Sequence, residues 1–254
     1  MKLEVIVLGC GSSAGTPVVG CHCPTCNSDD KRNHRTRAST VIRANGVSFL
    51  IDTGPDLRQQ ALRENIERVD AVLYTHPHSD HLNGIDDLRA YCYHQRGVVP
   101  LFGNAFTLDN IQQRFPYAFF PPSQYWDKPV LSANVVEQAF EFQGIKVTPI
   151  PVMHGTWPIY GYRIGNVAYI TDVSEIPDSS RHLLQGLDLL LLDSLRRVPH
   201  PTHFSFDQAV AEAQRISAQQ TLLIHMTHEL SYQDMAAALP ENIAPAYDGL
   251  RIVL

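Results

Sequence analysis

The chain has 254 residues, of which 44% are hydrophobic and 18% charged, and its formal net charge is −6. This length is enough to bury a hydrophobic core without disulfide or metal cross-links. The acidic balance supplies no overall positive field for a long polyanion, and no apolar run approaches the roughly 18 residues of a membrane-spanning helix. We therefore expect neither a long nucleic acid nor a membrane as a partner.

The N-terminal stretch MKLEVIVLGCG contains one lysine and a short apolar run that Glu4 interrupts, which is typical of a first β-strand rather than a secretion signal. We therefore predict a cytoplasmic location, where thiols stay reduced. Three of the five cysteines, Cys21, Cys23 and Cys26, stand close together in GCHCPTC. In a reducing compartment this crowding favours metal binding over a disulfide framework.

Strands and helices alternate along the chain without repeats or a linker, which predicts one domain over residues 1–254. In the first half, strands are expected at 3–8, 39–44, 47–52, 70–75 and 98–103, and helices at 56–65, 82–95 and 106–115. Asn45-Gly46 is the hairpin signal between two of these strands. The stretch 116–128, rich in proline and aromatic residues, predicts a fixed surface loop that forms a pocket lid or an interface.

The second half repeats this organisation. Strands are expected at 144–152, 187–194 and 221–224, a hairpin about Gly165-Asn166 at 162–171, and a closing Asp-Gly turn signal within 246–254. Ser205 and Gln208 form a capping box at the start of an amphipathic helix over 205–217. Two successive sets of strands and helices predict two sheets packed face to face, with helices outside.

A basic stretch, KRNHRTR at 31–37, is short and isolated. It favours a solvated loop, with a phosphate-binding patch as the alternative.

The strongest chemical signal is THPHSDH at 75–81, directly after the apolar strand AVLY. His76, His78, Asp80 and His81 fall within six residues, and packing alone would not require such a group. Imidazole nitrogens and a carboxylate are ligands for one or two divalent metal ions. The stretch therefore predicts a metal site.

Three further residues follow apolar strands in the same way: His154, Asp172 and His225. Because such strand ends meet at one edge of a sheet, these residues complete a two-metal site. We expect His76, His78 and His154 on one ion, Asp80, His81 and His225 on the other, and Asp172 bridging both.

The sequence resembles the metallo-β-lactamase superfamily of binuclear metallohydrolases, since HPHSDH matches its HxHxDH motif and the later ligands follow in order. This resemblance implies an α/β fold, a four-layer αββα sandwich, and an enzyme. The segments LGCGSSAGTPVVGCHCPTC, RTRAST, HSDHLNGIDDLR and LIHMTHE are similar to the phosphodiesterase branch, typified by the cyclic ribosyl phosphodiesterase of the carbon–phosphorus lyase pathway.

That branch implies a structural zinc ion, bound by Cys21, Cys23, Cys26 and a His three residues after the last catalytic ligand, here His228. Independently, three thiolates leave a tetrahedral zinc one ligand short, and a Cys₃His set closes it. The alternative is that His228 is a surface residue. The remaining cysteines, Cys10 and Cys92, are expected to be small buried hydrophobic residues.

A leaving alkoxide needs a proton donor, and PHPTHFSFDQ offers His203 and His200. His203 matches the catalytic histidine of the branch and is the predicted general acid, with His200 as the alternative. The hypothesised mechanism has two ions, Zn²⁺ or Mn²⁺, activating a bridging water that attacks phosphorus. Asp80 and Asp172 would orient the attacking water. Asp52 is either a partner of a metal-bound histidine or a helix cap.

The expected substrate is a small cyclic phosphodiester, a cyclic ribose phosphate or a 2′,3′-cyclic nucleotide. Arg89, in the GIDDLR stretch that is similar to the branch, is a candidate phosphate contact, with packing or ion pairing within a helix as the alternative. The alternatives are a thioester or lactone hydrolase on the same fold, a tRNA 3′-processing-type nuclease, and a zinc-organised scaffold without turnover. The branch resemblance and the aromatic stretch 116–126 also predict a homodimer.

Overall fold

The computed structural model describes residues 1–125 and 127–254. Trp126, the last residue of the predicted aromatic stretch, lies outside the described residues. No helix among the described residues is long and apolar enough to cross a membrane.

The first sheet has seven strands in the order β14-β1-β2-β3-β4-β5-β6, and β3 to β6 run parallel. Its strands are β1 (Leu3–Gly9), β2 (Ser39–Ala44), β3 (Val47–Ile51), β4 (Ala71–Leu73), β5 (Val99–Gly103), β6 (Leu131–Val135) and β14 (Arg251–Val253). The α-helices of this half are α1 (Leu57–Arg63), α2 (Ser79–Leu82), α3 (Leu88–Gln95) and α4 (Ala105–Arg114). The 3₁₀ helices are η1 (Lys31–Asn33), η2 (Ile85–Asp87) and η3 (Pro116–Phe119).

The second sheet also has seven strands, in the order β13-β12-β11-β10-β9-β8-β7, and β10 to β13 run parallel. Its strands are β7 (Phe140–Phe142), β8 (Ile145–His154), β9 (Trp157–Ile164), β10 (Val167–Ile170), β11 (Leu189–Asp193), β12 (Gln220–Ile224) and β13 (Ile243–Pro245). Its helices are α5 (Asp178–Arg181), α6 (Phe206–Ile216) and α7 (Tyr232–Ala238), with the 3₁₀ helix η4 (His182–Leu184).

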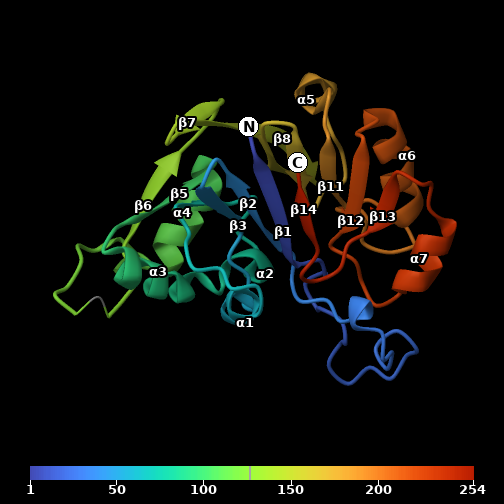
Figure 1. The fold of residues 1–254 in the computed structure, drawn as a ribbon, viewed down its shortest axis with the longest axis horizontal. Helices are drawn as coiled ribbons and strands as arrows, with labels where there is room; N and C mark the ends of the chain where they lie inside the picture. Colours follow the sequence, from blue (N-terminus) through green and yellow to red (C-terminus); the bar gives the residue numbers. More distant parts are fainter. Residues whose placement is uncertain (126) are drawn as a thin grey trace.

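The two sheets pack face to face with helices on both outer sides, which confirms the predicted αββα sandwich (Figure 1). Alternate side chains of β1 show why. Val5 and Val7 join the core between the sheets with Val147, whereas Ile6 and Leu8 join a second cluster under the outer helices. Because successive side chains of a strand point to opposite faces, one strand serves both layers.

The predicted turns and caps agree with the structure. Asn45 and Gly46 have φ of 48° and 89°, as a two-residue hairpin requires. Ser205 and Gln208 form the reciprocal bonds of the capping box at the start of α6.

The helix predicted over 82–95 is interrupted. α2 ends at Leu82, η2 follows, and α3 begins at Leu88. The interruption coincides with a close contact between two backbones: a Cβ atom on Gly84 would lie 2.0 Å from the carbonyl oxygen of Gly54. The Gly84 N–H also donates to the carbonyl of Thr53 at 2.8 Å. This contact fixes α2, which carries Asp80 and His81, against the end of β3.

The stretch 31–37 differs from the solvated loop that we expected. Arg35 is only 1% exposed and donates to the backbone carbonyls of Thr227 and Leu230. Arg37 forms an ion pair with Asp56 at 3.1 Å. Arg35 and Arg37 therefore connect segments that are far apart in the chain. A count of charges in the sequence does not reveal such contacts.

We expect Gly84→Ala to destabilise the protein by about 1–3 kcal/mol, because the new methyl group would force the α2 segment away from the end of β3. Thermal unfolding followed by circular dichroism measures the change. Gly97→Ala is the matched control, since the nearest atom to its Cβ would be 3.7 Å away. Equal melting temperatures for the two variants would contradict the role of this contact.

Candidate metal centre

Polar side chains meet where the strands of both sheets end. Asp52 follows β3, the 76–81 stretch follows β4, His154 ends β8, Asp172 follows β10, Asp193 ends β11, and His225 follows β12. The carboxyl ends of parallel strands are where α/β proteins form their sites. The residues that we expected to act together therefore lie at the junction of the two sheets.

Three of these strand ends share an unusual backbone conformation. Asp52, Asp172 and His225 have φ of 60°, 54° and 58°, in the left-handed region that non-glycine residues rarely adopt. Such residues concentrate at functional sites, where the surrounding structure enforces them. Here the conformation turns each side chain from the strand toward the site.

The side chains form two clusters that share one carboxylate. One contains His76, His78, His154 and Asp172, and the other contains Asp80, His81, Asp172 and His225, with candidate ligand atoms within 4.8 Å of one another in each. This grouping has the same members as the two predicted ligand sets, with Asp172 common to both.

The separations suit a divalent metal ion. Nε2 of His81 lies 3.2 Å from Asp80 and 3.2 Å from Asp172, and Nε2 of His225 lies 3.4 Å from Asp172. Two ligands on one tetrahedral ion with bonds of about 2.1 Å are about 3.4 Å apart. The Nε2 atoms of His81 and His225 are buried and make no hydrogen bond to the described residues. Residues of this kind in this arrangement fit a metal ion.

The opposite ring nitrogens of the histidines are held by other groups. Nδ1 of His81 lies 2.7 Å from the carboxylate of Asp52, which also accepts from the backbone N–H and hydroxyl of Thr75. Nδ1 of His154 contacts the backbone carbonyls of Asp172 and Thr202. Partners of this kind orient metal-binding imidazoles. The position of Asp52 agrees with the first of its two expected roles, the partner of a histidine, rather than a helix cap.

Asp193 is a residue that our reading of the sequence missed. Its Oδ2 lies 3.2 Å from Nδ1 of His203, and its Oδ1 lies 3.4 Å from Nδ1 of His225. The side chain of Asp193 is fully buried. The signal was available, because Asp193 ends the apolar strand LDLLLLD and so occupies the same position as the predicted ligands.

His203 lies beside the two clusters, as its predicted role requires. Its ring stacks on that of His225 with centroids 5.0 Å apart and planes 8° apart. Its Nε2 lies 3.7 Å from Asp172. His200 lies behind it, with ring centroids 5.3 Å apart, and its Nδ1 contacts the hydroxyl of Thr202.

The N-terminal cysteines form a third cluster. The Sγ atoms of Cys21, Cys23 and Cys26 lie 3.3, 3.3 and 3.5 Å from Nδ1 of His228. In a tetrahedral zinc site the sulfur and nitrogen ligands would be about 3.5 Å apart. Hydrogen bonding from the Cys26 backbone N–H, together with His228, lowers the pKa of Cys23 to about 6, which favours the thiolate. The four side chains therefore fit a zinc ion.

The cysteine cluster and the His/Asp clusters adjoin one cleft of about 400 Å³. Its walls include Ser13, Val18, His78, His203 and His228. The backbone N–H of Val18 donates to Sγ of Cys26 at 3.3 Å, so the cysteine loop also holds part of the cleft wall.

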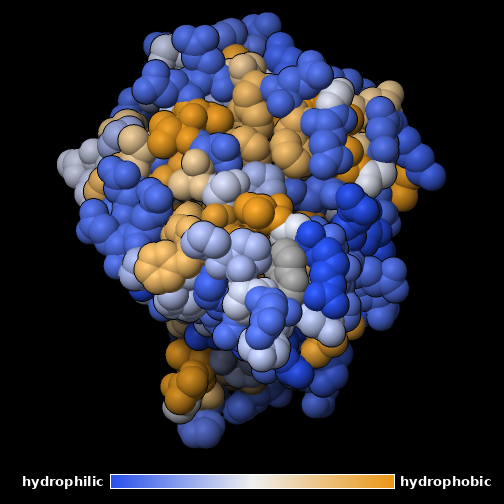
Figure 2. All heavy atoms as spheres, turned by 90° about the vertical axis from the view of Figure 1, so that its left-hand side faces the viewer, coloured by the Kyte–Doolittle hydropathy of each residue, from blue (hydrophilic) through white to orange (hydrophobic). Residues whose placement is uncertain are grey.

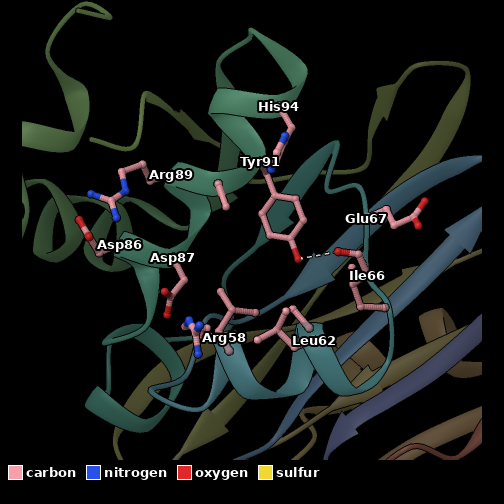
Figure 3. Close-up of a pocket in the computed structure, with 12 residues that line it drawn as sticks. Arg58, Leu62, Ile66, Glu67, Asp86, Asp87, Arg89, Tyr91 and His94 are labelled. Carbon is pink, nitrogen blue, oxygen red and sulfur yellow. Dashed lines mark hydrogen bonds between the residues drawn. The ribbon is translucent and has the colours of Figure 1, made fainter. Parts of the chain in front are cut away.

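Arg89 does not lie in this cleft, which corrects our expectation of a phosphate contact. It lines a separate pocket of about 530 Å³ between α1 and α3, where it is drawn beside Asp86 (Figure 3). Its Nη1 donates to the backbone carbonyl of Asp127.

Comparison with known proteins identifies the family. A family model described as beta-lactamase superfamily domain matches residues 48–226. The chain belongs to the metallo-β-lactamase superfamily. The solved structure of "a New Diphosphatase from the PhnP Family" is 41% identical, covers 100% of this chain and 98% of that one, and superposes with a TM-score of 0.94.

Two other comparisons are relevant. Zinc-bound PqqB from Methylobacterium extorquens is 19% identical with a TM-score of 0.81, covers 99% of this chain and 100% of that one, and supports the fold. An octanoyltransferase from Porphyromonas gingivalis is 39% identical over 99% of this chain, but the match covers only 52% of that protein. This chain thus spans about half the length of that curated relative.

In this superfamily member, carboxylates control the protonation of the candidate ligands. Against the effect of burial, Asp172 and other carboxylates raise the pKa of His225 to about 10 and that of His81 well above its usual range. Burial lowers the pKa of His76, which keeps it neutral. Without metal, His81 and His225 therefore carry protons at neutral pH and pair with the carboxylates.

We expect metal binding to the cluster of Asp80, His81, Asp172 and His225 to release about two protons at pH 7, because both imidazoles must lose a proton to bind. Affinity for Mn²⁺ should then rise by up to about 100-fold per pH unit between pH 6 and 8. Calorimetric titration in two buffers of different ionisation enthalpy measures the release. Heats that do not depend on the buffer would contradict the protonation assigned to the metal-free protein.

We expect Cys23→Ser to lose about one zinc ion per chain and to destabilise the protein before it abolishes catalysis, because binding energy at such a site is also folding energy. A loss of about 2 kcal/mol lowers the Tm of a chain of this size by about 5 °C. Elemental analysis and thermal unfolding provide the two measurements. His22→Ala, at an exposed position between the ligands, is the control. An unchanged zinc content in Cys23→Ser would rule out the site.

Proposed function

We propose that the protein is a metal-dependent hydrolase that cleaves a phosphorus–oxygen bond in a small phosphorylated molecule. Small cyclic phosphodiesters, either cyclic ribose phosphates or 2′,3′-cyclic nucleotides, are the first candidate substrates. The observation that carries this proposal is the pair of His/Asp clusters sharing Asp172, with His203 beside them. Membership of the superfamily and the likeness to a diphosphatase support hydrolysis.

We assign two divalent ions, Zn²⁺ or Mn²⁺, to the His/Asp clusters and one Zn²⁺ to the cysteine cluster. When bound, the active-site ions would lower the pKa of a water and offset negative charge on the phosphoryl oxygens. The family and the zinc-bound PqqB neighbour support divalent metal binding. Asp80 and Asp172 would bind the ions and orient the attacking water with their carboxylate oxygens.

His203 would protonate the leaving oxygen. Asp193 accepts the Nδ1 proton of His203, so Nε2 is the nitrogen that faces Asp172 and the cleft. The contact with Asp193 orients the imidazole so that Nε2 is available as a proton donor. His200 also lines the cleft but contacts Thr202 rather than a carboxylate. His203 is therefore the better candidate for the acid.

A diphosphate linkage is the second candidate bond. The diphosphatase of the PhnP family, at 41% identity over the whole chain, favours it. The chemistry is closely related, because an inner phosphorus of a diphosphate diester carries two bridging oxygens, as does the phosphorus of a phosphodiester. One arrangement of His and Asp could therefore serve both bonds.

The other functions have weaker support. The octanoyltransferase name belongs to a protein about twice as long, so it leaves thioester or lactone hydrolysis as an alternative to test. Human tRNase Z, short form, is 16% identical with a TM-score of 0.71, which shows a shared fold only. A scaffold without turnover would not need Asp193 and His203 at the edge of a cleft.

Turnover of bis(p-nitrophenyl) phosphate by the Mn²⁺- or Zn²⁺-loaded protein is the first test, followed by a panel of cyclic phosphates, diphosphate diesters and thioesters with identified products. Cleavage of phosphorus substrates would support the proposal. Cleavage of thioesters alone would contradict the proposal and indicate a thioester hydrolase. Inactivity on every ester by a protein with a full metal content would favour a zinc-organised scaffold without turnover.

We expect His203→Ala to lower kcat by about 10²–10⁴ on substrates with an alkoxide leaving group, the usual contribution of a general acid. The loss should shrink when p-nitrophenolate leaves, since that group departs without a proton. His200→Ala is the matched control. The same loss for both leaving groups would remove His203 from the acid role.

The predicted homodimer remains a proposal. The face that carries α3, α4 and the segment after α4 shows hydrophobic side chains among hydrophilic ones (Figure 2). From this part of the chain, Tyr93, Val98, Phe120 and Tyr125 are 45%, 50%, 58% and 72% exposed. Exposed apolar side chains on one face are consistent with an interface.

A further inference from the structure

Arg196 is a charged residue in the metal cleft to which neither the motifs nor the mechanism assign a role. It lies in the connection between β11 and α6 and lines the same cleft of about 400 Å³ as Asp80, His200 and His203. Cavities of roughly 300–1,000 Å³ hold small-molecule ligands. A substrate bound at the His/Asp clusters therefore shares its cavity with this guanidinium group.

The backbone around Arg196 is fixed on both sides. The carbonyl of Arg196 accepts from the N–H of Phe206 at 2.8 Å, at the start of α6. The preceding residue, Leu195, donates to Phe204 and accepts from Thr227, two residues after His225. The position of Arg196 is thus tied to the helix after His203 and to the segment that carries a candidate metal ligand.

The side chain of Arg196 has more N–H donors than it uses within the described part of the chain. Its Nε donates to the backbone carbonyl of Val198 at 3.1 Å, and within the described part of the chain it forms no ion pair with a carboxylate. Other arginines do so: Arg37 pairs with Asp56, and Arg181 with Glu212. A half-buried guanidinium that lines a cleft with unused N–H groups is suited to bind an anionic ligand.

The neighbouring Arg197 is different. It is exposed, and its guanidinium lies 5.4 Å from the ring centroid of Phe206. It does not line the cleft. The two adjacent arginines therefore have distinct environments, and of the two only Arg196 lines the cleft.

Charge balance indicates what Arg196 would bind. Two divalent ions with the carboxylates of Asp80 and Asp172 would leave about two positive charges, which an attacking hydroxide and one singly charged phosphoryl group would offset. Glu229 also lines the cleft and adds negative charge there. A second phosphoryl group would therefore need a cation outside the centre, and a guanidinium can form two parallel hydrogen bonds to it.

We propose that Arg196 binds a second phosphoryl group of the substrate, next to the one that reacts at the metal centre. This inference rests on the proposed function, a hydrolase of phosphorus–oxygen bonds in small phosphorylated molecules. Within that function it favours the second candidate bond, the diphosphate linkage, over the small cyclic phosphodiesters placed first above. Arg196 is then a specificity-determining residue, and His203 remains the acid for the bond that breaks.

The test compares the binding of two probes to the metal-loaded protein by calorimetry: methylenediphosphonate, which carries two phosphoryl groups and is not hydrolysed, and inorganic phosphate, which carries one. For Arg196→Met we expect affinity for methylenediphosphonate to fall by about tenfold or more, as for the loss of charge-assisted hydrogen bonds. Phosphate affinity should change much less. Arg196→Lys keeps the charge but loses the paired donors, so its affinity for methylenediphosphonate should lie between those of Arg196→Met and the unaltered protein.

Arg197→Met is the matched control and should bind both probes as the unaltered protein does. Equal losses for the two probes in Arg196→Met, or no loss for either, would overturn the proposal. If Arg196→Met does not fold, as judged by circular dichroism, the affinities of Arg196→Lys for the two probes are compared with those of the unaltered protein, and the same criteria apply. Turnover of bis(p-nitrophenyl) phosphate tests the proposed function separately, because that substrate has only one phosphoryl group.

Discussion

The site depends on buried carboxylates that hold imidazoles in place. Asp172 contacts imidazoles from both clusters, Asp52 holds His81, and Asp193 holds His203 and lies 3.4 Å from His225. Ionised carboxylates are costly to bury unless they are paired. These three are buried at the ends of strands from both sheets, and each has histidine partners. Neither sheet contains a complete cluster, so the geometry of the site depends on how the two sheets pack against each other.

The segment around His225 joins this centre to the N-terminal region. Three residues after His225, His228 closes the cysteine cluster, and the buried Arg35 bonds to the carbonyls of Thr227 and Leu230. The same segment therefore has contacts with a candidate active-site ion, a candidate structural ion and a buried cation. A change in the cysteine loop would reach the cleft directly, through the bond between Val18 and Cys26.

Much of the fold and most of the candidate site could be predicted from the sequence, because the candidate ligands lie at strand ends and strand ends are recognisable from apolar runs. His154, Asp172 and His225 were all predicted in this way, and Asp193 could have been. Arg89 was misplaced because its role was inferred from the resemblance of GIDDLR to the phosphodiesterase branch, whereas in the structure it lines a separate pocket. The environments of Arg35 and Arg196 could not be predicted, because the residues around them come from segments distant in sequence. Local patterns also do not predict the left-handed conformations of Asp52, Asp172 and His225.

The protons that the carboxylates keep on His81 and His225 have a consequence for how the protein matures. In the metal-free chain these protons balance the charge of Asp80 and Asp172, so the active-site side chains have partners before any ion arrives. Divalent ions bound at the His/Asp clusters would therefore replace protons in a site whose side chains already have partners. The cysteine cluster lies on a loop between β1 and η1, so an ion bound there would contribute more to the folding of that loop. Metal binding would thus be coupled to deprotonation at one kind of site and to folding at the other.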